Sequence, residues 1–239
     1  MICAVAKGDR TEIDMELKII ARIRTDFEEK FGIPRQSGIA KNVGRIVFEP
    51  EYRVREALRG LDGYSHLWLL WEFSEAQREG WSPTVRPPRL GGNRRMGVFA
   101  TRSPYRPNPI GLSSVRLLGI EESEGEGVVL TVEGADLLDG TPIYDIKPYL
   151  AYTDSHPDAI GGFADGVRDY ALNVNFDLHL LDKIPEDKRD ALITVLENDP
   201  RPSYKGDGDH EYGMRYAGFD VYFKVECGAL TVTRIECKQ

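Results

Sequence analysis

Between residues 17 and 147 the chain alternates short apolar segments with turns rich in glycine and proline, which limits its fold more than any other feature. Many short strands with few intervening helices favour a β-barrel or a closed β-sheet. The dense apolar run Leu67–Phe73 is expected to be a strand buried on both faces. Tyr52–Leu61 is expected to form one or two helical turns, with Val54 and Leu58 on the buried face. The other expected strands are Leu17–Arg24, Val43–Phe48, Gly97–Thr101, Gly111–Ile120, Gly127–Glu133 and Thr141–Lys147.

A smaller α+β unit is expected to follow this mainly β part. Pro185–Asn198 predicts a helix because proline opens it, acidic residues crowd its first turn and an apolar stripe runs along it. The stripe consists of Ala191, Leu192, Val195 and Leu196. A meander of three strands is expected at Tyr212–Tyr216, Phe219–Val225 and Leu230–Ile235. The expected organisation is a leader at 1–16, a β-barrel domain at 17–152, a linker or long loop at 153–180 and a small C-terminal domain at 181–239.

The composition of the chain limits the class of protein and the cellular compartment that we expect. It has 239 residues, 41% of them hydrophobic and 29% charged, which is ordinary for a globular protein. No apolar run approaches the roughly 20 residues of a membrane span, and the N-terminus lacks the layout of a signal peptide. Three scattered cysteines form neither a disulfide framework nor a metal-binding CxxC motif. We therefore expect a reduced, cytoplasmic protein with no membrane partner.

Arginine is concentrated in one window of an acidic chain. Residues 80–120 hold seven arginines and no aspartate or glutamate, whereas the whole chain has a net charge of −8. Guanidinium groups bind carboxylates and phosphates in a bidentate manner, and the turns that present them here are stiffened by proline. The window therefore indicates a binding site better than a solvated surface. Its arginines are Arg86, Arg89, Arg94, Arg95, Arg102, Arg106 and Arg116.

Part of this window is expected to contact RNA. Arg86, Arg89, Arg94 and Arg95 fall in one loop suited to the phosphate backbone, although the acidity of the rest argues against a sequence-blind polyanion binder. In the C-terminal unit, the residues able to extend that surface are Arg201, Tyr204, Lys205 and Arg215, with Tyr204 available for stacking. A plain packing module remains an equal alternative for that unit.

The string MGVFATRSPYRPNPIGLSSVRL at 96–117 resembles the signature of the TsaA-like family, also called TrmO. Further blocks follow the expected order, and the resemblance covers about residues 18 to 235: KFGIPRQSG at 30–38, GLDGYSHLWLLWEF at 60–73, RPPRLGGNRRMG at 86–97, DLLDGTPIYDIKPYL at 136–150 and DPRPSY at 199–204. The resemblance implies a β-barrel that binds S-adenosylmethionine. It also implies a homodimer, with the cofactor near the subunit interface, that methylates N6-threonylcarbamoyladenosine beside the anticodon of a threonine tRNA. Consistently, no strand is followed by the GxGxxG motif of a Rossmann cofactor site.

The resemblance also assigns residues to the cofactor. These are Pro34, Arg35, Gln36, His66, Leu67, Arg102, Leu112, Asp139, Gly140, Thr141 and Pro142. Taken alone, several have simpler interpretations that stay open: a polar turn at 34–36, a structural histidine at a strand edge, and a hairpin loop at 139–142. The functional interpretation requires the turn around Ser103 and the loop after Leu138 to converge on one pocket.

No residue stands out as a catalytic base. Candidates are Asn108 and the pair Tyr144 and Asp145, expected on opposite faces of a strand. Arg106 and Asn108 suit either the threonyl carboxylate of the modified base or a tRNA phosphate.

Two other functions are also weighed. One is a non-catalytic RNA-binding β-barrel that uses the arginine-rich loop. The other is a metal-dependent hydrolase, whose ligands would match no standard spacing: Asp136, Asp139, Asp154 and His156.

Overall fold

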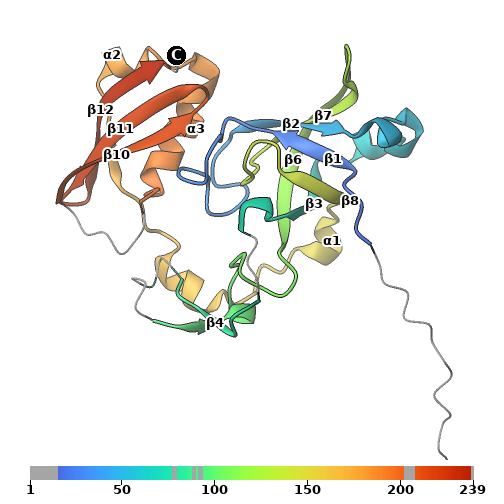
Figure 1. Cartoon of the computed structure of the whole chain (residues 1–239), viewed down its shortest axis with the longest axis horizontal. Helices are drawn as coiled ribbons and strands as arrows, with labels where there is room; N and C mark the ends of the chain where they lie inside the picture. Colours follow the sequence, from blue (N-terminus) through green and yellow to red (C-terminus); the bar gives the residue numbers. More distant parts are fainter. Residues whose placement is uncertain (1–15, 77–79, 88–89, 91–93, 202–207, 238–239) are drawn as a thin grey trace, which may run out of the picture.

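The computed structural model describes residues 16–76, 80–87, 90, 94–201 and 208–237. Figure 1 shows two units side by side, a β-barrel and a C-terminal sheet flanked by helices. No helix in the described ranges is long and apolar enough to cross a membrane. The mainly β architecture expected from the sequence is therefore confirmed.

Six antiparallel strands close the barrel in the order β1-β2-β7-β6-β3-β8, and β8 returns to β1. Their bounds are β1 Ala21–Arg24, β2 Val43–Phe48, β3 His66–Glu72, β6 Ile110–Ser123, β7 Gly127–Glu133 and β8 Pro142–Pro148. Alternate residues face inward, so Leu67 and Leu69 of β3 are both 0% exposed. Closure leaves no free strand edge in this sheet.

The interior is tightest where Trp71 of β3 crosses Gly111 of β6. These residues are paired in register, and a Cβ atom on Gly111 would lie 2.2 Å from the indole ring. The indole nitrogen donates to Ser113 Oγ at 2.9 Å, and the ring packs against Phe73 with centroids 4.3 Å apart. A glycine is therefore required at 111 to let the indole lie flat against the barrel wall.

Some expected elements differ from the structure. Tyr52–Leu61 forms separate 3-10 helices, η1 Pro50–Tyr52, η2 Arg55–Leu58 and η3 Leu61–Gly63, interrupted at Gly60 by a φ of 83°. Val54 is 50% exposed, so its expected burial was wrong. The second face of β3 is only half-buried.

The expected strand Gly97–Thr101 was also mostly wrong. Only β5, Met96–Gly97, is extended, and it pairs with β4, Thr84–Val85, to form a short hairpin. Residues Val98–Ala100 form the 3-10 helix η6, which places the buried Val98 inward. Another short 3-10 helix, η4 Ser74–Ala76, follows β3.

The C-terminal unit contains a four-stranded sheet in the order β10-β11-β12-β9. Its strands are β9 Asn173–Asn175, β10 Gly208–Tyr216, β11 Phe219–Glu226 and β12 Ala229–Cys237. Both hairpin turns, at Ala217-Gly218 and Cys227-Gly228, have positive φ at two successive residues, as type I′ turns require. The expected meander is thus confirmed, with slightly longer strands.

Helix α3, Glu186–Glu197, packs against this sheet and buries the four residues of the expected apolar stripe. The preceding segment, expected to be a linker at 153–180, carries the 3-10 helix η7 Gly162–Val167 and the short helix α2 Leu178–Leu181, and follows helix α1 Ala151–Asp154. It also contains β9, which pairs in parallel with β12. The C-terminal sheet therefore begins inside that segment.

The connection between β1 and β2 joins the two units. Phe27 and Ala40 are 0% and 2% exposed, and both belong to the apolar core of the C-terminal unit. Lys188 of α3 reaches back to Asp26 at 2.6 Å, and the amide of Arg215 donates to Glu29 at 2.9 Å. The loop at 25–42 is thus packed against the second unit rather than solvated.

Replacing Gly111 with alanine should destabilise the barrel, since the added methyl group has to displace the Trp71 ring. We expect the free energy of unfolding to fall by about 2 kcal/mol, the usual cost of overpacking a core. The matched control is Gly119→Ala on the same strand, where an added Cβ meets no atom within 4 Å. Urea denaturation of both variants checks this, and equal midpoints would contradict the tight crossing.

Candidate functional site at the loop end of the barrel

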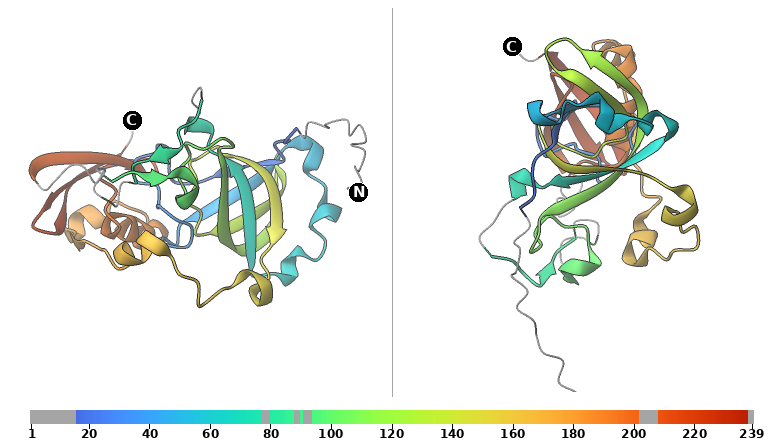
Figure 2. Two further views of the ribbon diagram at one scale, coloured as in Figure 1. Left: turned by 90° about the horizontal axis from the view of Figure 1, so that it is seen from below. Right: turned by 90° about the vertical axis from the view of Figure 1, so that its right-hand side faces the viewer.

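Three long loops leave the barrel at one end. Because all neighbouring strands are antiparallel, the loops at 25–42, 73–109 and 134–141 all emerge where β1, β3 and β7 finish. We call this the loop end. Figure 2 (left) shows it turned toward the C-terminal unit, with the 3-10 helices η1–η3 at the opposite end. The expected cofactor segments at 34–36, 102 and 139–142 thus share one end of the barrel.

Gln36 and Arg102 meet at this end. The guanidinium of Arg102 donates to Gln36 Oε1, linking the 25–42 loop with the 73–109 loop across 66 residues of sequence. Backbone contacts tie the first loop to the third, with the Gly38 amide donating to the Gly134 carbonyl at 2.8 Å. Arg102 is exposed and Gln36 half-buried, so the pair lies at an accessible rim.

Beneath this pair lies a buried carboxylate that sequence reasoning placed only in the hydrolase alternative. Asp136 Oδ1 accepts from the Ser113 hydroxyl at 2.5 Å, and Ser113 in turn accepts from Trp71. Burial raises the pKa of Asp136, although bonds from Ser113 and the Ser37 backbone and the charge of Arg102 oppose that shift. The signal available in the sequence was its position at the start of DLLDGTP. The charge of Arg102 and the Ser37 backbone both act on Asp136, so this buried carboxyl group lies close to the Gln36–Arg102 rim.

Arg35 points elsewhere. Its Nη2 donates to the carbonyl oxygens of Asp199 and Arg201, each at 3.0 Å, so the guanidinium faces the C-terminal unit. A cavity of about 250 Å³ lies beside it, lined by residues 30–35 together with Val195, Asn198, Pro200 and Arg201. Arg35 and Gln36 are adjacent in sequence, but within one chain their side chains contact different elements. Arg35 contacts the C-terminal unit, and Gln36 contacts Arg102.

Arg201 is a structural residue. It is 6% exposed, its Nε donates to Asp199 Oδ1 at 2.8 Å, and Tyr170 donates to the second carboxylate oxygen at 2.9 Å. Burial tends to raise the pKa of Asp199, but the bonds from Arg201 and Tyr170 hold that pKa below its usual value. A guanidinium enclosed in this way is not presented to RNA, which corrects the interpretation from sequence. Arg215 lies 3.4 Å from Asp220 on the surface, while Tyr204 and Lys205 lie outside the described residues.

His66 and Leu67 lie away from the loop end, at the start of β3. His66 is exposed and its Nδ1 contacts Ser65 Oγ at 2.9 Å, whereas Leu67 is 0% exposed inside the barrel. Leu112, 56% exposed, pairs with Leu70, four residues further along β3. At about 3.3 Å per residue, roughly 13 Å separates it from His66. A single chain thus brings Gln36 and Arg102 together, while His66 lies at the opposite end of β3 from the loop that carries Arg102.

The loop at 139–142 is held by its own contacts. Asp139 accepts from the Thr25 amide at 3.0 Å and lies 3.6 Å from Arg24, and Thr141 Oγ1 donates to the Leu138 carbonyl at 2.7 Å. Gly140 has a φ of 78°, which suits glycine, and Pro142 is buried. These contacts make the loop rigid and fix it against β1.

A β-bulge changes the expected geometry of Tyr144 and Asp145. Trp71 pairs with Ile143 and Leu70 with Asp145, so Tyr144 is the extra residue. Tyr144 bonds to Glu72, and Asp145 lies 2.7 Å from Lys147, both on the outer face of the sheet. The expectation of opposite faces was therefore wrong. Burial and the bond to Glu72 raise the pKa of Tyr144 to about 12, so it stays protonated near neutral pH.

Arg106 braces the proline-rich turn, since its Nη2 donates to the Thr101 carbonyl at 3.2 Å. Asn108 is exposed beside it, and its carbonyl accepts from the Ile110 amide at 2.8 Å. Arg86, Arg94 and Arg95 are exposed on the β4–β5 hairpin and its flanks, and Arg89 lies outside the described residues. These arginines thus have three different environments. Arg106 stabilises the turn, Arg102 lies at the rim, and the others that the structure describes are exposed on the surface.

The ligands of the hydrolase alternative do not gather. Asp154 accepts from the Trp68 indole nitrogen at 2.8 Å and from the Leu150 amide, whereas Asp136 accepts from Ser113. In the part of the chain that the structure describes, no three His, Cys, Asp or Glu residues are placed to hold a metal ion. This arrangement gives the hydrolase alternative no support.

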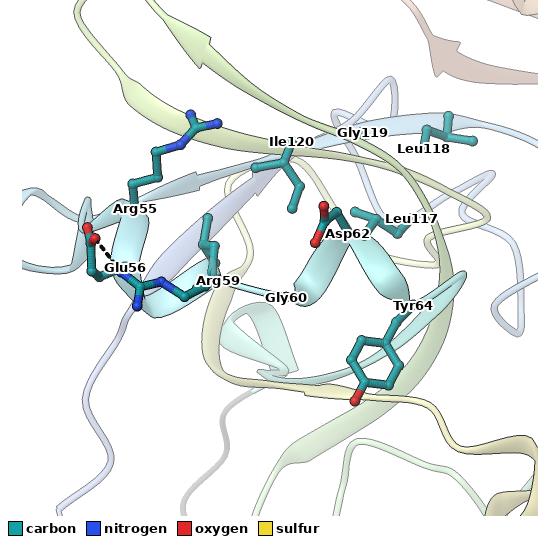
Figure 3. A pocket seen from close by; sticks show the side chains of 11 residues that line it. Arg55, Glu56, Arg59, Gly60, Asp62, Tyr64, Leu117, Leu118, Gly119 and Ile120 are labelled. Atoms are coloured by element: carbon teal, nitrogen blue, oxygen red, sulfur yellow. Dashed lines mark hydrogen bonds and ion pairs between the residues drawn. The ribbon is translucent and has the colours of Figure 1, made fainter.

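A larger cavity, of about 520 Å³, lies at the end opposite the loops. Figure 3 shows it between the 3-10 helices and β6, with Arg59 bound to Glu56 at its edge and Leu117 and Ile120 on its wall. Neither this cavity nor the smaller one includes Gln36 or Arg102. At the rim that carries those two residues, Arg102 is exposed and Gln36 is half-buried.

Comparison with known proteins agrees with this architecture. Residues 22–155 match the family model of the tRNA-methyltransferase O N-terminal domain, and residues 169–238 match that of the TrmO C-terminal domain. The chain belongs to the tRNA-methyltransferase O family. A crystal structure of TrmO from Pseudomonas aeruginosa superposes with a TM-score of 0.74 at 34% identity, covering 94% of this chain and 100% of that one.

Two relatives carry informative names. The tRNA (adenine(37)-N6)-methyltransferase of Escherichia coli K12 is 42% identical over 223 residues, 85% of this chain and 94% of that protein. An Archaeoglobus fulgidus protein named as a probable S-adenosyl-L-methionine-binding protein is 39% identical over 152 residues, 63% of this chain and 38% of that protein. The second match corresponds in length to the barrel alone.

Arg201→Ala should destabilise the C-terminal unit because it leaves the Asp199 carboxylate buried without its main partner. Removing one member of a buried ion pair typically costs about 3–5 kcal/mol. Arg215→Ala, which removes an exposed partner of Asp220, should cost less than about 1 kcal/mol. Thermal unfolding compares the two variants. An Arg201→Ala protein of unchanged stability and weakened RNA affinity would restore the RNA-binding role.

Asp136→Asn should become relatively more stable as pH rises. The folded-state pKa of Asp136 lies above its unfolded value, so its contribution is full below the unfolded pKa and is lost as pH rises through the folded pKa. An asparagine side chain does not titrate, so the variant has no such loss of stability as pH rises. The Tm of Asp136→Asn minus that of the unmodified protein should therefore increase from pH 4 to pH 7.5.

Glu126→Gln provides the opposite control for this pH series. Bonds from Arg45 and Ser123 lower the pKa of Glu126, so stability there is gained above the unfolded pKa and lost on acidification. The Tm of Glu126→Gln minus that of the unmodified protein should therefore decrease over the same pH range. Parallel trends for the two variants would contradict the assigned environment of Asp136.

Proposed function

We propose that this chain transfers the methyl group of S-adenosylmethionine to the N6 nitrogen of adenosine 37 in a threonine tRNA that already carries the threonylcarbamoyl group. Membership of the tRNA-methyltransferase O family supports the reaction class. Within the structure, the observation that carries the proposal is the meeting of Gln36 and Arg102 above the buried Asp136.

The residues at the loop end fit this cofactor chemically. A guanidinium at Arg102 suits the methionine carboxylate, the Gln36 amide suits an ammonium or a hydroxyl group, and exposed Leu112 offers apolar contact. The buried Asp136 carboxyl group lies close enough to Arg102 for the charge of the guanidinium to lower its pKa against the effect of burial. When bound, the cofactor supplies a methyl group on a sulfonium, which is already a strong electrophile.

The protein's own contribution is alignment. Backbone bonds join the loops at 25–42 and 134–141, and Arg106 braces the turn next to Arg102, so Gln36 and Arg102 lose little freedom on binding a ligand. Tyr144, which stays protonated near neutral pH, can donate a hydrogen bond to the substrate but cannot take its proton. We assign no general base to Tyr144, and Asp145 and Asn108 remain candidates.

A second copy of the chain completes the site in this proposal. His66, expected to contact the cofactor, is the first residue of β3, whereas Arg102 lies in the loop that follows the other end of that strand; in this proposal the two contacts of one site come from different chains. The exposure of Arg102 at the rim agrees with a half-site. The homodimer and the cytoplasmic location remain predictions.

Replacing Arg102 with alanine should weaken cofactor binding by about 10- to 100-fold, as expected for the loss of a charge-assisted hydrogen bond. Calorimetry measures binding, and nucleoside mass spectrometry follows methylation of tRNA with and without threonylcarbamoyl. Arg59→Ala, an exposed arginine at the opposite end, is the control.

Each part of the proposal fails separately in this experiment. Tight cofactor binding by Arg102→Ala would remove the assigned site. Equal methylation of tRNA lacking threonylcarbamoyl would refute the substrate. RNA binding by the unmodified protein, with no cofactor binding and no methyl transfer, would identify the non-catalytic RNA-binding barrel instead.

A further inference from the structure

Two large aromatic side chains lie exposed on the 73–109 loop. Trp81 is 53% exposed and Phe99 is 74% exposed, yet their ring centroids are only 6.1 Å apart with an angle of 31° between the planes. They flank the β4–β5 hairpin, which projects from the barrel in Figures 1 and 2. The pair is thus presented to solvent by a defined element.

The backbone fixes this arrangement. The Val98 amide donates to the Pro83 carbonyl at 2.9 Å and joins the two flanks of the hairpin. Val98 is 1% exposed and anchors η6, so the neighbouring Phe99 is directed outward. Since burying one such ring is worth about 1.5–3 kcal/mol, two that stay exposed at fixed positions point to a ligand.

The surroundings specify an anionic ligand. Residues 80–120 contain no carboxylate side chain, and Arg86, Arg94 and Arg95 are exposed on the same hairpin or beside it. Arg95 Nη1 donates to Thr84 Oγ1 at 3.4 Å, which keeps its guanidinium over the hairpin. Aromatic faces interleaved with guanidinium groups suit an unpaired nucleotide, whose base stacks while its phosphate is neutralised.

The distance to the candidate site limits which nucleotide this is. Arg102 follows Phe99 by three residues, a span of at most about 11 Å of extended chain. Bases of one strand stack about 3.4 Å apart, so this span corresponds to about three nucleotides. The ring pair is therefore within reach of the bases next to an adenosine whose N6 lies beside the cofactor held at Arg102.

We propose that Trp81 and Phe99 form a stacking platform for an unpaired base of the tRNA anticodon loop, close to the methylated adenosine. Arg95 contacts a flanking phosphate. The proposal rests on the proposed function for the identity of the RNA, and it names the part of the substrate that the hairpin recognises.

The test measures the affinity of the full chain for an anticodon stem–loop oligonucleotide at several salt concentrations. Trp81→Ala and Phe99→Ala should each weaken binding by about 5- to 100-fold, while Trp81→Phe keeps most of it. Because no charge is removed, the salt slope should stay unchanged, whereas Arg95→Ala should lower it by about 1. Tyr152→Ala, at an aromatic residue 87% exposed elsewhere, is the matched control.

Cofactor affinity and Tm are measured on the same variants and should not change. Unaltered RNA affinity in both alanine variants overturns the platform, as does an unmodified protein that binds no RNA. A changed oligomeric state in sedimentation would assign the rings to a contact between copies and also overturn it. Aromatic-dependent RNA binding without methyl transfer would support the platform while removing the proposed function.

Discussion

Burial of Phe27 in the C-terminal core is the constraint on which the rest of the structure depends. Phe27 follows β1 by three residues, so its position fixes the start of the loop that carries Pro34 to Gln36. Its ring lies 5.6 Å from that of Tyr216, whose hydroxyl donates to the Lys188 carbonyl at 3.1 Å. A loop of this length would otherwise be mobile and entropically costly to order. Here the second unit supplies that order.

This docking divides the loop into two functional halves. The half nearest the C-terminal unit includes Gly32, where a Cβ would lie 2.6 Å from Met214, and Arg35 with its two carbonyl partners. The other half turns back to the barrel, where Gln36 meets Arg102 and the Ser37 hydroxyl accepts from Ser114. The C-terminal unit thus acts on the candidate site through backbone position, even though Arg201 is enclosed in its interior.

Local sequence patterns predicted the elements in which periodicity and burial agree. β2 and β7 match their expected bounds, and α3 buries the expected apolar stripe. The predictions that were wrong concern features that depend on contacts between residues distant in sequence. The bulge at Tyr144 depends on pairing with β3, and the enclosure of Arg201 depends on Asp199 taking a φ of 52°.

The arginine-rich window shows that a cluster of charged residues in a sequence does not by itself identify a binding site. Arg116 lies 3.6 Å from Glu133 on the neighbouring strand, and Arg106 is directed to a backbone carbonyl. Arg102 instead lies over a carboxylate that is costly to keep charged, because Asp136 is buried and its pKa is raised. The neighbouring acids therefore distinguish arginines that look equivalent in sequence: Arg116 is paired with a carboxylate of the next strand, whereas Arg102 lies at the rim beside a buried carboxyl group.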